Sequence, residues 1–166
     1  GQATRDVLTP IRSALKERRS EELRQQTATA LGLLQDQEGV PLLLEELDRA
    51  KSQNVKGQVV LALAKIGDAR AVEPMVNLLK ELKNAKSQNV KGQVVLALAK
   101  IGDARAVDPL IGLLQDEGEQ DLTRALACAG LGVIGDLEWL PSLSRVSLDV
   151  NYRASTDLIN EVLSLI

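Results

Sequence analysis

The stretch AKSQNVKGQVVLALAKIGDARAV occupies residues 50–72 and recurs without a single change at residues 85–107. Weaker copies flank this pair: residues 20–36 read SEELRQQTATALGLLQD, and residues 122–136 read LTRALACAGLGVIGD. The five prolines of the chain keep a similar spacing of 31–35 residues, at Pro10, Pro41, Pro74, Pro109 and Pro141. Self-similarity at such a period is typical of repeat architectures built from one supersecondary unit.

Each unit predicts two helices. In the first, apolar residues fall on one face at helical spacing, namely Val55, Val59, Ala62, Leu63 and Ile66. Gly67 predicts the end of this type A helix, and Asp68 predicts an N-cap for a type B helix that begins near Pro74. Proline is tolerated in a first turn, so the five prolines are expected to mark helix starts. Strict alternation of apolar and polar residues is not sustained anywhere, which argues against strands.

Extended along the chain, this pattern predicts a type B helix at 8–18, A/B pairs at 21–34 and 40–50, 53–66 and 70–84, 88–101 and 105–116, and 121–134 and 138–146, and a last type A helix at 150–166. We therefore expect one domain, 1–166, with units at about 20–50, 51–85, 86–118 and 119–148 and half repeats at 1–19 and 149–166. Gly1 and the apolar final residues DLINEVLSLI predict a segment of a longer protein. The identical central units favour recent duplication in a natural protein.

The amino-acid composition argues against several classes of function. The chain is 45% apolar and 26% charged, which is the profile of a soluble globular protein, and a cytoplasmic location is favoured. It contains no histidine, the commonest general base and metal ligand. The single Cys128 cannot form an internal disulfide, and the net charge of −3 disfavours broad nucleic-acid binding. No apolar run approaches the roughly 18–20 residues of a membrane span.

The string VKGQVVLALAKIGDARAVEPMVNLL, residues 55–79, resembles the short bacterial and archaeal HEAT-like repeat that is also found in phycobilisome bilin lyases. The chain departs from that pattern with Lys56 and Lys91 in place of Arg, and with Ala64 and Ala99 in place of Gly. The resemblance implies an all-α, right-handed α-solenoid of stacked antiparallel helix pairs, with about four full repeats. No chromophore-handling residue can be carried over from the repeat pattern.

Small residues are expected to let neighbouring helices approach closely. They are Ala62, Ala64, Ala97, Ala99, Gly130 and Gly132.

A second face of the type A helix is the best candidate binding site. Asn54, Gln58, Leu61 and Lys65 cluster on the helical wheel away from the core stripe. Their counterparts in the neighbouring units are Asn89, Gln93, Leu96 and Lys100, together with Gln26 and Leu33 and their neighbours Glu22 and Thr29. The resemblance implies that this is the concave binding face, as in artificial scaffolds of the family. Leucines flanked by amides and a lysine suit a protein or peptide partner; the alternative is an ordinary solvated helix face.

A recurring cation forms a second series, Arg24, Lys56, Lys91 and Arg124. We expect these side chains to stack and to reach helix-turn carbonyls or the aspartates of adjacent Gly-Asp turns. Those aspartates are Asp36, Asp68, Asp103 and Asp136. If the cations pointed outward instead, they would form a track for a phosphate backbone.

The remaining candidates are weak. The acidic loop from Asp116 to Asp121 lacks the ligand spacing of an EF-hand, and Cys128 is expected to act as a compact apolar side chain. No phosphate-cradling loop or nucleophilic triad is present. The sequence predicts a non-enzymatic scaffold or adaptor without cofactor or metal that binds a protein or peptide. The alternatives are a nucleic-acid-tracking groove and an accessory subunit in bilin or cofactor attachment.

Overall fold

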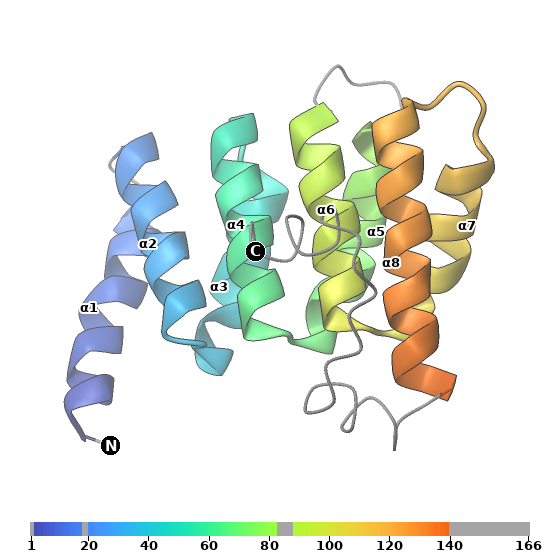
Figure 1. Ribbon diagram of the computed structural model, residues 1–166. Coiled ribbons are helices and arrows are strands. Elements are labelled where there is room, and N and C mark those ends of the chain that lie inside the picture. Colours follow the sequence, from blue (N-terminus) through green and yellow to red (C-terminus); the bar gives the residue numbers. More distant parts are fainter. Residues whose placement is uncertain (1, 18–19, 83–87, 140–166) are drawn as a thin grey trace.

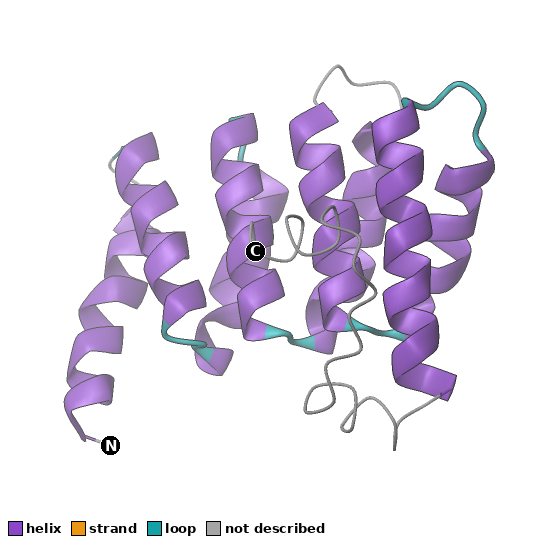
Figure 2. Cartoon of the chain, in the orientation of Figure 1, coloured by secondary structure: helices purple, strands orange, loops and turns teal. Residues whose placement is uncertain are grey.

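A computed structural model describes residues 2–17, 20–82 and 88–139. Within these ranges all regular structure is helical (Figure 2). The α-helices are α1 (Gln2–Glu17), α2 (Glu21–Leu33), α3 (Val40–Arg49), α4 (Gln53–Ile66), α5 (Val72–Glu81), α6 (Gln88–Ile101), α7 (Val107–Gln115) and α8 (Asp121–Trp139). Short 3₁₀ segments precede three of them: η1 (Gln37–Gly39), η2 (Ala69–Ala71) and η4 (Ala104–Ala106).

The helices form two layers. The even-numbered helices α2, α4, α6 and α8 stand side by side, each in contact with the next, and form what we call the A layer (Figure 1). The odd-numbered helices form the B layer behind them, where α1 packs on α2, α3 on α4, α5 on α6 and α7 on α8. The predicted all-α solenoid of antiparallel helix pairs is confirmed.

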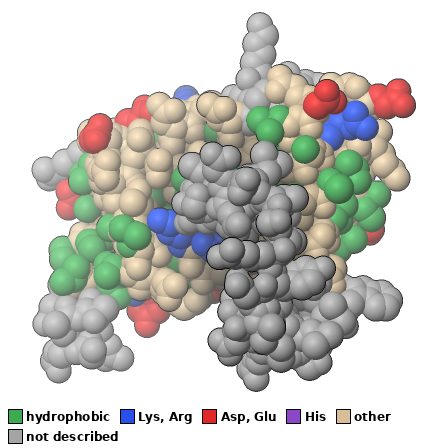
Figure 3. Space-filling model, viewed as in Figure 1, with side chains coloured by type: hydrophobic (Ala, Val, Ile, Leu, Met, Phe, Trp, Pro, Cys, Tyr) green, Lys and Arg blue, Asp and Glu red, His purple; other side chains and the backbone are tan. Residues whose placement is uncertain are grey.

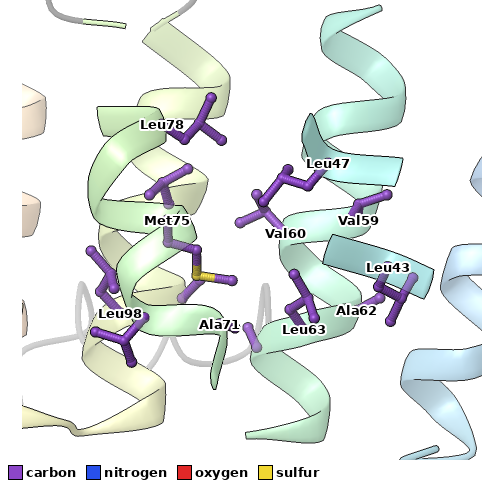
Figure 4. Packing of buried hydrophobic residues seen from close by; sticks show 14 of the residues in the cluster. Leu43, Leu47, Val59, Val60, Ala62, Leu63, Ala71, Met75, Leu78 and Leu98 are labelled. Carbon is purple, nitrogen blue, oxygen red and sulfur yellow. The ribbon is translucent and has the colours of Figure 1, made fainter. Parts of the chain in front are cut away.

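The core lies between the two layers. All five members of the predicted stripe on α4 are buried, and Met75 and Leu78 of α5 meet them from the B layer (Figure 4). The same holds in the next unit, where Leu98 of α6 and Leu110 of α7 are fully buried. Full burial of one such side chain contributes roughly 1.5–3 kcal/mol, so stacking of successive units is the main source of stability.

Helix ends follow the expected local chemistry. Ser20 caps α2, because its hydroxyl accepts a hydrogen bond from the Leu23 N–H at 3.0 Å. Gly67 and Gly102 close α4 and α6 with φ of 73° and 72°, a left-handed conformation that glycine adopts without strain. Asp68 and Asp103 cap the 3₁₀ turns that lead into α5 and α7, so the predicted B helices begin one turn later than their caps.

Two predicted boundaries are wrong. Pro10 lies inside α1, which begins at Gln2, so this proline does not mark a helix start. Gly135 does not close a helix, because α8 continues through it to Trp139. The turns at Asp68 and Asp103 are held by an arginine two residues after the aspartate, whereas that position is Glu138 in the last unit. It is also an acidic residue, Glu38, in the first unit, where Arg12 of α1 supplies the cation. The predicted helix at 150–166, and all of the helix at 138–146 beyond Trp139, lie outside the described residues.

Candidate functional site

The ten predicted binding residues lie on α2, α4 and α6, on the outer surface of the A layer. None of them is buried: Gln26, Leu33, Asn54, Asn89 and Lys100 are exposed, and the others are half-buried. Leu33 is 65% exposed, an unusual value for a large apolar side chain. We call this surface the A face. Its role in binding stays a prediction.

Glutamines of the A face fill the grooves between neighbouring helices. Oε1 of Gln58, on α4, lies 3.3 Å from the Thr29 hydroxyl on α2. The equivalent Gln93, on α6, covers Gly57 of α4 so closely that a Cβ at position 57 would collide with the Gln93 Oε1 atom. The two amides therefore lean toward the preceding helix.

Small residues fix the spacing of the A layer. A Cβ added to Gly32 of α2 would lie 2.7 Å from the Cα atom of Ala62 on α4, and one added to Gly130 of α8 would lie 3.1 Å from Cβ of Ala99 on α6. The predicted close approach is therefore observed at these two junctions. Gly132 is different: it is exposed, and a Cβ there would meet nothing within 4 Å.

The recurring cations point into the structure, but the predicted aspartate partners are wrong. Arg24 pairs with Glu46 near the C-terminus of α3 at 2.9 Å, and Lys91 pairs with Glu119 after α7 at 2.6 Å. Lys91 is the most deeply buried of the four cations, with 1% of its side chain exposed, and Glu119 is only 4% exposed. The Arg24 Nε atom is buried and has no hydrogen-bond partner among the described residues.

The other two cations, Lys56 and Arg124, contact groups in the last turn of a B helix. Lys56 lies 3.9 Å from Glu81, the last residue of α5, and Arg124 donates from Nε to the Leu114 carbonyl at 3.0 Å. Each cation therefore sits in the first turn of an A helix and reaches a carboxylate or carbonyl in the last turns of a B helix or in the loop that follows it. Consequently, the four cations do not form an outward track for a phosphate backbone.

The Gly-Asp turns have their own arginine partners, which the sequence reading missed. Nε and Nη2 of Arg70 donate to the Asp68 carboxylate, with shortest distances of 3.0 and 2.6 Å, and the same two atoms of Arg105 donate to Asp103. The Arg105 guanidinium lowers the pKa of Asp103 to about 2, with help from the Arg105 backbone N–H. The signal was present in the repeated letters Asp-Ala-Arg.

These arginines also connect successive turns. Nη2 of Arg105 donates to the Ala69 carbonyl at 2.8 Å, and Nη2 of Arg70 donates to the Gln37 carbonyl at 3.0 Å. In the first unit Arg12 of α1 supplies the cation, and it pairs with Asp36 and Glu38. Asp136 has no described side-chain position.

The remaining candidate residues divide between structure and surface. Glu119 and Asp121 of the acidic loop pair with Lys91 and Arg124, and the described part of the chain holds no group of three metal-binding side chains. Cys128 is exposed on α8, so its predicted packing as a compact apolar side chain is wrong. No helix in the described ranges is long and apolar enough to cross a membrane.

Two grooves open on the B layer. One, of about 330 Å³, lies between α1 and α3 and is lined by Leu15, Leu42 and Glu46 among others. Its counterpart one unit later, of about 320 Å³, lies between α3 and α5 beside Lys56 and Glu81. Both are shallow junctions between successive units and contain none of the predicted binding residues.

Comparison with known proteins agrees with this geometry. A family model described as HEAT repeats matches residues 8–81 and 75–156. The chain belongs to the HEAT repeat family. Part of this HEAT repeat protein is 45% identical, over 55 residues, to the bilin biosynthesis protein PecE of Nostoc sp.; the match covers 33% of this chain and 22% of that protein. PecE of Mastigocladus laminosus is 45% identical over 54 residues, which cover 32% of this chain and 20% of that protein. The similarity thus spans about a fifth of the length of these curated relatives.

Proposed function

We propose that this HEAT repeat protein is a non-enzymatic scaffold or adaptor that binds a protein or peptide along the A face. The observation that supports this most directly is the placement of equivalent residues on three successive helices, all outside the core. Leu61 and Leu96 supply apolar contact area, while the amides of Gln58 and Gln93 can both donate and accept hydrogen bonds.

The packing of the A layer favours binding without rearrangement. Gly32 against Ala62, and Ala99 against Gly130, hold the neighbouring helices at close approach. A surface whose spacing is fixed in advance loses little conformational entropy when a partner binds, and this preorganisation raises affinity.

The test replaces Leu61 and Leu96 with aspartate in the full chain. We expect a partner isolated on the wild-type protein to bind the double variant at least about tenfold more weakly, since two buried apolar contacts become charges. Circular dichroism verifies that the variant keeps its helicity. The matched control carries Val7→Asp and Ile111→Asp, two exposed apolar residues of the B layer, and should bind normally. Equal affinity of wild type and the Leu61/Leu96 variant would reject the proposal.

A second candidate, an accessory role in bilin or cofactor attachment, is favoured by the partial similarity to PecE. Co-expression with a bilin biosynthetic pathway tests it. Pigment should co-purify with the chain or with a protein bound to it, and colourless preparations would count against this role.

A further inference from the structure

One row of side chains across the A face changes from apolar to basic and back between successive units. Leu33, Lys65, Lys100 and Val133 occupy equivalent positions of the repeat on α2, α4, α6 and α8. The row therefore reads apolar, basic, basic, apolar along the solenoid. None of these four side chains is buried.

No acidic side chain that the structure describes neutralises the two lysines. Neither α4 nor α6 contains an acidic residue, and among the described residues neither Lys65 nor Lys100 forms an ion pair. The aspartates of the turns that follow these helices are occupied by Arg70 and Arg105. Acidic side chains in the visible part of the A face lie toward its edges (Figure 3). Although the net charge of the chain is −3, α4 and α6 thus contribute lysines and no acidic residue to this face.

The spacing of the row fits an extended chain. Packed helices lie about 8–10 Å apart, and an extended peptide in the polyproline II conformation has three residues per turn and advances about 3.1 Å per residue, so its side chains i and i+3 lie on one face. Every third residue of a peptide that runs across the A helices would therefore meet the next member of the row.

We propose that the A face binds an extended peptide segment with two acidic side chains three residues apart, flanked by apolar ones, and that Lys65 and Lys100 pair with the two carboxylates. This inference rests on the proposed function and names its partner class. A single-stranded nucleic acid is disfavoured, because the described part of the A face offers no aromatic side chain on which bases could stack.

The test is a selection from a random dodecapeptide library displayed on phage, with the full chain immobilised. We expect enriched peptides to carry Asp or Glu at two positions three residues apart. The Lys65→Glu, Lys100→Glu variant should lose this enrichment, and a selected peptide should bind it about tenfold or more weakly, since attraction becomes repulsion at two sites. Raising the salt concentration should weaken the wild-type complex. The charge-matched control, Lys16→Glu with Lys80→Glu, alters exposed lysines of the B layer and should select the same peptides as wild type.

Several outcomes would overturn the inference: no enrichment, enriched peptides without the acidic pair, an unchanged peptide set on the Lys65/Lys100 variant, or tighter binding of a single-stranded oligonucleotide than of the peptides. The Leu61→Asp, Leu96→Asp variant separates this inference from the proposed function. Suppose that the leucine variant loses binding of non-acidic peptides and that the Lys65→Glu, Lys100→Glu variant selects the same peptides as wild type. The A face then binds peptides, but the proposal that they are acidic is wrong. If neither variant changes the selection, both proposals are rejected.

Discussion

Helices α4 and α6 have the same fourteen-residue sequence, QNVKGQVVLALAKI, yet their first lysines have different surroundings. Lys91 on α6 is buried and lies 2.6 Å from the buried carboxylate of Glu119. Lys56 on α4 keeps 15% of its side chain exposed and lies 3.9 Å from Glu81, whose side chain is 69% exposed. Identical helices therefore hold one buried ion pair and one loose surface contact.

The difference originates outside the duplicated stretch. Glu81 ends α5 and Glu119 lies in the acidic loop after α7, and neither belongs to residues 50–72 or 85–107. A duplicated helix carries its apolar stripe into the new unit, because that stripe meets the apolar side of a B helix in both units. Its polar side chains instead take whatever partner the neighbouring loop provides.

The largest expected effect on stability comes from removing the charge of Lys91, and the same change at Lys56 is the comparison. Lys91→Met leaves the Glu119 carboxylate buried without its partner, and we expect a loss of about 3–5 kcal/mol in the free energy of unfolding. Lys56→Met should cost less than about 1 kcal/mol, because Glu81 stays in solvent. Urea unfolding followed by circular dichroism measures both.

A double variant sharpens this contrast. Lys91→Met combined with Glu119→Leu removes both charges from the interior, so most of the lost stability should return. Equal losses for Lys56→Met and Lys91→Met would mean that the two units are energetically equivalent despite their geometry.

A smaller effect is expected where the two units are the same. Gly67 and Gly102 both have a left-handed backbone, so an alanine at either position should cost about 1–2 kcal/mol through backbone strain. A Cβ at Gly67 would meet nothing within 4 Å, so strain is the only penalty there. Gly112→Ala, in an exposed helical position, is the control and should be neutral or slightly stabilising. Losses that differ by more than about 1 kcal/mol between Gly67→Ala and Gly102→Ala would contradict this equivalence.

Sequence reasoning succeeded where a prediction depended on one helix alone. The stripe from Val55 to Ile66 and the closing role of Gly67 follow from period and backbone freedom, and both are observed. The inward direction of the recurring cations was also predictable from their position beside the stripe. Their carboxylate partners were not, since Glu46 and Glu119 approach only after two layers have packed.

Errors arose where a repeated pattern was extended to a diverged unit. Gly135 matches Gly67 in sequence, yet α8 continues through it to Trp139. For the A face, the sequence indicated the direction of the side chains but not their contacts. A helical wheel placed Gln58 and Gln93 away from the core, but it could not show that they lean into the grooves between helices.

The smallest expected effect concerns the paired turns, which are largely exposed. Because Arg105 lowers the pKa of Asp103 from 3.8 to about 2, the folded state favours the ionised carboxylate. This contribution to stability is fully present above pH of about 4 and is lost as the pH falls toward about 2. Asp103→Asn keeps the cap to the Arg105 N–H but removes the charge. Its urea midpoint should therefore lie below that of wild type at pH 5, and the gap should close as the pH falls.

The pKa of Asp68 is lowered for the same reason, by hydrogen bonds from Arg70, so Asp68→Asn should show the same pH dependence. Arg105→Gln removes the guanidinium and should return the titration of Asp103 toward its ordinary range, which nuclear magnetic resonance of the carboxylate can follow. A gap between Asp103→Asn and wild type that stays constant over this pH range would mean that the ion pair adds nothing. The cap and the carbonyl contact between turns would then hold successive units in register by geometry alone, in both copies of the duplicated sequence.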